Sequence, residues 1–182
     1  MNNKIENFSF LNSTGVELKV DFGYQIDDIF KKNSEENVKK FYDGSAKGVK
    51  WTYNRKEVVI EGCFFAYPSV DENYIIAIYP LEDKEFPSPN NAVVYNLDGS
   101  LHKVLTTPKL ISRLAIDRLG IDNPPYPYEP DSIYFSNVKW EKDGSGKIVS
   151  SIWIGYDREW HENRALNPTT GEFGECLGSG RM

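Results

Sequence analysis

Residues 133–177 have the sequence IYFSNVKWEKDGSGKIVSSIWIGYDREWHENRALNPTTGEFGECL, and this stretch decides the fold class. It contains four segments rich in Val, Ile, Tyr, Phe and Trp, the residues that favour strands. Turn sequences with Asp, Asn, Pro and Gly follow the first and the third segment. The predicted strands are Ile133–Glu141, Lys147–Tyr156, Glu159–Leu166 and Glu172–Leu177. We therefore predict an antiparallel meander for the C-terminal third.

The chain before this stretch shows the same preference for strands. Seven strands are predicted there, at Phe8–Leu11, Val16–Phe22, Val49–Tyr53, Val58–Tyr67, Tyr74–Tyr79, Val93–Leu97 and Leu101–Leu105. Val58–Tyr67 and Tyr74–Tyr79 are almost entirely apolar, which is typical of central strands covered on both faces. Asp98-Gly99 predicts a tight turn between the last two strands, because this dipeptide readily adopts positive φ angles.

Helical patterns are scarce. An apolar stripe predicts a helix over Pro108–Leu119, where Pro108 suits the first turn and Gly120 can end the helix. A weaker pattern over Ser34–Tyr42 indicates a second, short helix without a capping box. The prediction is one mostly β domain of residues 1–182, either a single antiparallel sheet or a sandwich- or barrel-like domain with one packed helix.

Length and composition limit the class of protein. The 182 residues, of 20.8 kDa, have the length of one ordinary domain. Hydrophobic residues make up 40% and charged residues 26%, which is typical of a globular chain. Twenty-one basic against 27 acidic residues give a net charge of -6, which argues against sequence-independent binding of nucleic acid. The mean hydropathy is -0.52, and no apolar run approaches the roughly 20 residues that span a membrane.

The N-terminus and the cysteines indicate the compartment. MNNKIENFSFLNSTG lacks the basic region, the apolar core and the cleavage site of a secretory signal. Cys63 and Cys176 are too few for a disulfide framework. We therefore expect a cytoplasmic protein.

The sequence offers little for catalysis. His102 and His161 are the two histidines, so we expect no metal site and no cofactor. Cys63 lies in an apolar strand, and Glu175 flanks Cys176, so neither thiol has the electropositive setting of a nucleophile. No glycine-rich stretch has the spacing of a phosphate-binding loop.

An alternative function is a carbohydrate- or small-ligand-binding β domain, possibly a hydrolytic one. Asp157, Glu159 and Glu162 offer paired carboxylates of the kind that glycoside hydrolysis uses. The chain also has four tryptophans that could serve as sugar platforms, Trp51, Trp140, Trp153 and Trp160. A concave pocket floored by two Trp faces would favour this alternative.

Two stretches carry a resemblance to known proteins. YNLDGSL, residues 95–101, resembles a strand-turn-strand phrase of bacterial β-repeat proteins. Trp160–Arg181, with LNP and TGEFG, is similar to the tails of small bacterial proteins, some of which are encoded beside toxins as immunity proteins. The resemblance implies a protein partner.

The first functional hypothesis is a non-enzymatic, cytoplasmic protein-binding module, in its most specific form an immunity or inhibitor protein that neutralises a bacterial toxin. A nuclease toxin presents a basic surface, and a chain with a net charge of -6 would be attracted to it. We expect a protein partner such as a basic toxin domain, and neither nucleic acid nor a membrane.

The predicted binding surface lies in the C-terminal meander, around Tyr156–Arg164. Its candidate residues are Asp157, Arg158, Glu159, Trp160, His161, Glu162 and Arg164. Charges of both signs beside a tryptophan suit a specific partner, because misaligned like charges are penalised. The alternative is that Trp160 belongs to the core and the charges form cross-strand pairs within the chain, which is the more common arrangement.

Overall fold

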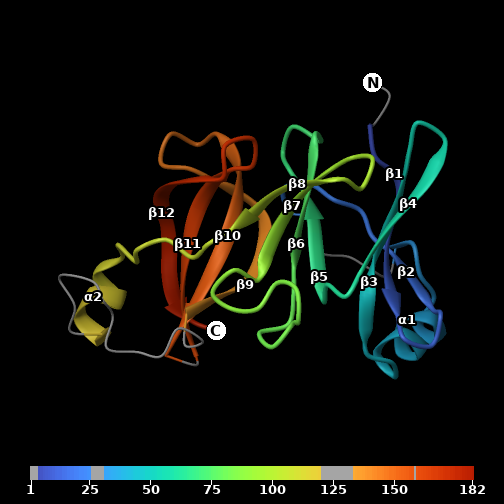
Figure 1. The fold of residues 1–182 in the computed structure, drawn as a ribbon, viewed down its shortest axis with the longest axis horizontal. Helices are drawn as coiled ribbons and strands as arrows, with labels where there is room; N and C mark the ends of the chain where they lie inside the picture. Colours follow the sequence, from blue (N-terminus) through green and yellow to red (C-terminus); the bar gives the residue numbers. More distant parts are fainter. Residues whose placement is uncertain (1–3, 26–30, 120–132, 158) are drawn as a thin grey trace.

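The computed structural model describes residues 4–25, 31–119, 133–157 and 159–182. These residues form three antiparallel four-stranded sheets and two helices, which confirms the mostly β prediction. The sheets stand side by side, with β1–β4 at one end, β5–β8 in the middle and β9–β12 at the other end (Figure 1). We call them the N-terminal, middle and C-terminal sheets.

The N-terminal sheet has the order β2-β1-β3-β4. Its strands are β1 (Glu6–Asn12), β2 (Glu17–Lys19), β3 (Ala46–Tyr53) and β4 (Lys56–Glu61). The short second helix is confirmed as α1 (Glu35–Tyr42), which begins after Ser34, whose side chain accepts a hydrogen bond from Asn37 N. Val38 and Phe41 of this helix pack on Leu18, so α1 covers the β2 side of the sheet.

The middle sheet has the order β5-β6-β7-β8. Its strands are β5 (Phe65–Pro68), β6 (Tyr74–Ile78), β7 (Ala92–Asn96) and β8 (Leu101–Leu105). The prediction of one central strand over Val58–Tyr67 is wrong, because the chain leaves β4 at Gly62, with φ +85°, and enters another sheet as β5. Both β4 and β5 are edge strands. The hairpin at Asp98-Gly99 is confirmed.

The C-terminal sheet has the order β12-β11-β10-β9, which confirms the predicted meander. Its strands are β9 (Ile133–Lys142), β10 (Ile148–Tyr156), β11 (Trp160–Asn167) and β12 (Glu172–Arg181). The predicted helix at Pro108–Leu119 is shorter than expected, because α2 comprises Arg113–Leu119. Ser112 caps this helix by accepting a hydrogen bond from Ala115 N (3.2 Å).

Two hydrophobic cores bury both faces of the middle sheet. Ile76 and Ile78 point to the C-terminal sheet and pack in one core with Phe135 and Ile152. Ile75 and Ala77, the alternate residues of β6, belong to the core shared with the N-terminal sheet, which also contains Trp51. The prediction of a central strand covered on both faces is therefore confirmed for Tyr74–Tyr79.

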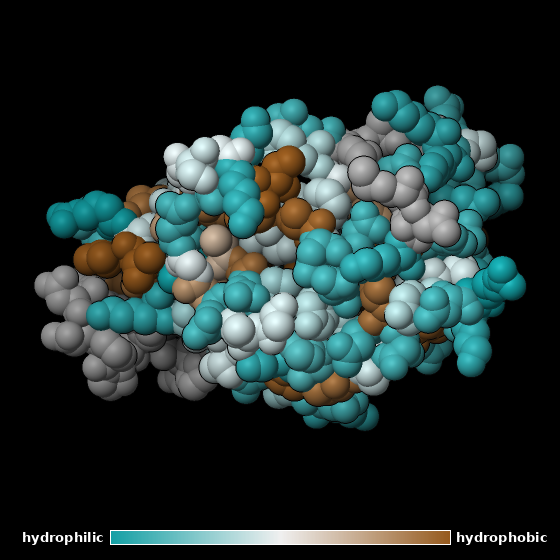
Figure 2. Space-filling view, turned by 90° about the horizontal axis from the view of Figure 1, so that it is seen from above, coloured by the Kyte–Doolittle hydropathy of each residue, from teal (hydrophilic) through white to brown (hydrophobic). Residues whose placement is uncertain are grey.

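The outer surface is mainly hydrophilic, with several separate hydrophobic patches on the face seen in Figure 2. Within the described ranges, neither helix is long and apolar enough to cross a membrane.

Candidate functional site

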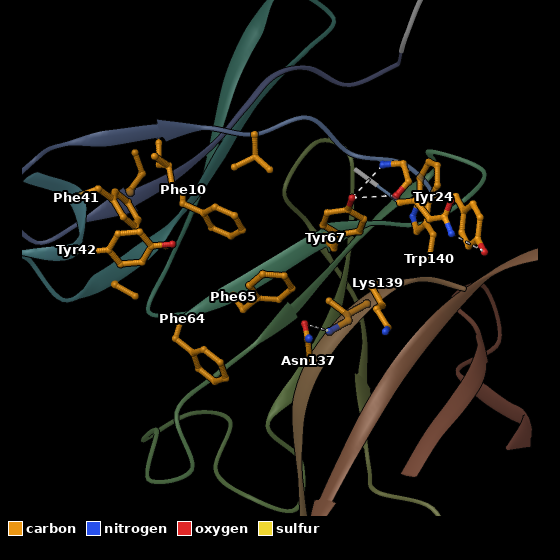
Figure 3. A pocket seen from close by; sticks show the side chains of 18 of the residues that line it. Phe10, Tyr24, Phe41, Tyr42, Phe64, Phe65, Tyr67, Asn137, Lys139 and Trp140 are labelled. Carbon is orange, nitrogen blue, oxygen red and sulfur yellow. Dashed lines mark hydrogen bonds between the residues drawn. The ribbon is translucent and has the colours of Figure 1, made fainter. Parts of the chain in front are cut away.

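A groove of about 810 Å³ opens where the three sheets meet. Its walls are the α1 side of the N-terminal sheet, strand β5 of the middle sheet and strand β9 of the C-terminal sheet (Figure 3). Its aromatic lining residues are Phe10, Tyr24, Phe41, Tyr42, Phe64, Phe65, Tyr67 and Trp140. The volume lies in the range of sites that bind ligands or partner side chains.

The floor of the groove is a row of aromatic rings. Phe10 and Phe65 stack with centroids 5.4 Å apart, and Phe65 and Tyr67 stack at 6.4 Å. Tyr67 meets Trp140 edge to face at 6.2 Å. The Trp140 Nε1–H donates to Pro68 O at 2.7 Å, which fixes the orientation of the indole. The floor is thus assembled from three sheets and held in one arrangement before any partner binds.

The rim of the groove is also aromatic. Tyr42 is 67% exposed and Phe64 is 39% exposed. Tyr42 is the last residue of α1, and Figure 3 shows it at one end of the groove, with Phe64 below Phe65. The buried amide of Asn12 holds the end of α1 in place, because its Nδ2 donates to Phe41 O at 2.9 Å. Exposed large aromatics beside a pre-formed groove are typical of a protein-interaction surface.

The charged residues of the described groove lining come from β9. Lys139 lies 3.1 Å from Glu141, and the Lys142 ammonium lies 5.2 Å above the ring of Tyr24. Glu141 is the one carboxylate among the described lining residues, and Trp140 is the one tryptophan there. The described part of the groove lining therefore shows neither the paired carboxylates of a glycosidase nor a floor of two Trp faces.

The residues predicted from the charge cluster lie on two faces of β11, because side chains alternate along a strand. Glu162 and Arg164 lie inside, under the segment that leads into α2. His161 faces the opposite side and stacks on Trp153 with centroids 4.2 Å apart. The structure therefore does not bring the predicted residues together on one surface.

Glu162 and Arg164 form a buried ion pair that anchors this inner segment. Glu162 is fully buried and accepts hydrogen bonds from Ser112 N (2.7 Å) and Ile111 N (3.0 Å). Arg164 Nη1 lies 3.1 Å from Glu162 Oε1, and the guanidinium also donates to Gly174 O (2.7 Å). These contacts of both charged groups are within the chain, but the pair lies along β11 rather than across two strands as the alternative expected.

The remaining candidates are at the exposed end of the sheet. Asp157 pairs with Arg118 Nη2 at 2.8 Å, and this guanidinium covers the half-buried ring of Trp160 at 4.0 Å. Glu159 pairs with Arg181 at 2.6 Å. Arg158 lies outside the described residues. Trp160 packs against the core on its other side, so Trp160 is a core-edge residue.

His161 is buried in a polar cluster on the outer face of the C-terminal sheet. Its pKa is lowered, first by burial and then by the charge of Lys139, while Glu141 opposes the shift. Its Nδ1 has no hydrogen-bond partner among the residues that the structure describes. The folded protein therefore favours the neutral imidazole more than the unfolded chain does.

This lowered pKa predicts a pH-dependent stability. In the unfolded chain His161 titrates near its ordinary pKa of 6.5, so below that pH the unfolded state binds more protons than the folded state. We expect the free energy of unfolding to fall as the pH drops below 6.5 and through the lowered pKa of the folded state. Urea unfolding at several pH values measures it. His161→Phe should flatten the dependence, and an unchanged slope in that variant would contradict the assignment.

The described residues show no group of three or more His, Cys, Asp or Glu that could hold a metal ion. Cys63 and Cys176 are both free thiols. Burial raises the pKa of Cys63 to about 12 and also raises that of Cys176. Neither cysteine is present as a reactive thiolate near neutral pH.

Comparison with known proteins agrees with this fold. No family model matches the chain, and no curated protein matches it. The fold is similar to that of a chain in a solved structure described as "Structure of Tne2 in complex with Tni2", with a TM-score of 0.60 and 9% sequence identity. The similarity covers 95% of this chain and 97% of that chain, so nearly the whole architecture is shared.

Proposed function

We propose that the chain is a non-enzymatic, cytoplasmic protein-binding module and, more specifically, an immunity protein that neutralises a bacterial toxin. The observation that carries the proposal is the fold shared with a chain from a complex of two proteins, Tne2 and Tni2. The net charge of -6 supports a basic partner, because opposite charges accelerate encounter. The aromatic groove supplies the anchor surface that such a partner needs.

The test begins with the partner. The tagged chain is used to recover bound protein from its native organism, and the recovered gene is expressed in a bacterial host with and without this chain. We expect growth arrest by the partner alone, restored growth on co-expression, and a complex that elutes as one species. A partner without toxicity would contradict the immunity function.

Groove variants locate the surface. Tyr42→Ala and Phe64→Ser should each weaken partner binding about thirtyfold, which corresponds to the roughly 2 kcal/mol of a hot-spot residue. Leu101→Ser is the matched control, because Leu101 is 51% exposed on β8 and does not line the groove. Equal losses in all three variants would place the binding surface elsewhere.

A further inference from the structure

Strand β9 is the outermost strand of its sheet and runs along the groove. At the hairpin turn, Asp143 N donates to Lys147 O at 2.9 Å, which makes these two residues a hydrogen-bonded pair. Antiparallel pairs alternate between hydrogen-bonded and non-hydrogen-bonded positions. Lys142 and Trp140, which lie opposite Ile148 and Ser150, therefore direct their backbone N–H and C=O groups away from β10.

The earlier part of this strand edge already has partners. The Asn91 side chain donates to Phe135 O and accepts from Phe135 N, both at 2.9 Å. The Val138 N–H donates to the Asn137 side chain at 2.8 Å. The backbone groups of Trp140 and Lys142 make no hydrogen bond to a described residue beyond the sheet. This portion of β9 is thus an open edge, and it is the portion beside the aromatic floor.

An open edge of this kind is a template for one more strand. A segment that adds to β9 would direct alternate side chains toward the floor formed by Phe65 and Tyr67. The side chain of Trp140 already bridges β9 and β5 through Pro68 O, so the floor beneath such a segment is fixed. Backbone pairing would supply affinity, and the aromatic floor would select apolar side chains.

The charge of the groove lining indicates which charged group a bound segment would carry. Lys139 and Lys142 against Glu141 give the described lining a formal charge of +1, whereas the whole chain has -6. Lys139 is neutralised by Glu141, but exposed Lys142 forms no ion pair with a described residue. A carboxylate on the incoming segment would complement this ammonium at the open end of the edge.

We infer that the groove binds an extended segment of the partner protein, which adds as a strand to the Trp140–Lys142 edge of β9, places apolar side chains on the aromatic floor and pairs a carboxylate with Lys142. This inference rests on the proposed protein-binding function and specifies how the partner is held.

The test uses a display library of random 12-residue peptides, selected on the immobilised full chain. We expect enriched peptides with alternating apolar residues and one Asp or Glu. With the best synthetic peptide, hydrogen exchange should show new protection at the amides of Trp140 and Lys142. A selection that enriches nothing, or protection confined to another surface, would overturn the inference.

Two substitutions at one position separate the backbone from the charge. Lys142→Gln removes the cation and keeps the N–H, so peptide affinity should fall about twofold to fivefold. Lys142→Pro also removes the N–H, and proline is tolerated on the free side of an edge strand. We expect a further loss of about tenfold for Lys142→Pro. Equal affinities of the two variants would overturn strand addition, and circular dichroism checks that both remain folded.

Failure of this inference is distinguishable from failure of the proposed function. If a toxin partner binds the wild type and Lys142→Pro equally well, the chain is an immunity protein that uses another mode of contact. If peptides bind as expected but the native partner is not a toxin, the result supports strand addition and contradicts the immunity function.

Discussion

Glu162→Ala is expected to lower the free energy of unfolding by about 3–5 kcal/mol. Arg164 is only 6% exposed, and the substitution leaves its guanidinium without the carboxylate that it pairs with. It also removes the acceptor for the backbone N–H groups of Ile111 and Ser112. A buried charge without a partner is costly, because neither water nor another group replaces the lost interaction. Urea denaturation measures the effect.

Glu159→Ala is the matched control. Glu159 also pairs with an arginine, Arg181, but both side chains are largely exposed, so the loss should stay below about 1 kcal/mol. The double variant Glu162→Leu, Arg164→Met removes both buried charges and should cost less than the sum of the two single changes. Strict additivity in this cycle would show that the buried pair is not coupled as the geometry indicates.

The contrast between Glu162 and Glu159 shows where sequence analysis of the site ends. Both residues lie in one charged stretch, and charged side chains are almost always exposed, so the stretch indicated a surface. Burial of Glu162 depends on the segment before α2, which lies some 50 residues away in the chain. The strand pattern places Glu162 and Arg164 on one face, but it does not say which face is covered.

The groove was missed for the same reason. Its floor joins Phe10, Phe65 and Trp140, which come from three sheets and are distant in sequence. The apolar run that contains Phe64 and Phe65 predicted core, and only the break at Gly62 takes the chain into the next sheet. A pair of aromatics after a glycine in an apolar run was the available signal, because glycine inside a strand pattern often marks a bend.

The elements that were predicted well are set by local chemistry. Asp98-Gly99 and the turn closed by Gly146, with φ +85°, each fix a hairpin within a few residues. The predicted helix at Pro108–Leu119 was too long, because its first residues fit the apolar stripe of a helix. In the structure, Ile111 N and Ser112 N instead donate to the Glu162 carboxylate. Tertiary contacts thus overrode the local preference.

Asn91→Ala is expected to destabilise the protein by about 3 kcal/mol, since each buried backbone group left without a partner costs about 1–3 kcal/mol. The Asn91 side chain is fully buried. It donates to Tyr79 O, directly after β6, and to Phe135 O in β9, and it accepts from Phe135 N. The described strands of the middle and C-terminal sheets share no backbone hydrogen bonds at this point, and the Asn91 side chain supplies hydrogen bonds in their place. Thermal and urea unfolding measure the loss.

Hydrogen exchange adds a readout that a general loss of stability would not give. Without the Asn91 side chain, the Phe135 amide should lose protection beyond the change seen at the amides of β10, because its own acceptor is gone. Asn96→Ala, at the far end of the strand that follows Asn91, is the control. Its Nδ2 donates to Ser100 Oγ at 3.0 Å on the exposed side, so its removal should change stability by less than about 1 kcal/mol. If Phe135 kept its protection in Asn91→Ala, the Asn91 side chain would not be the group that protects this amide, and the join between the middle and C-terminal sheets would depend on core packing and on other contacts such as that of Trp140 with Pro68 O. The contrast along the edge of β9, between Phe135, which is hydrogen-bonded to Asn91, and the open edge at Trp140 and Lys142, would then not explain where the groove begins.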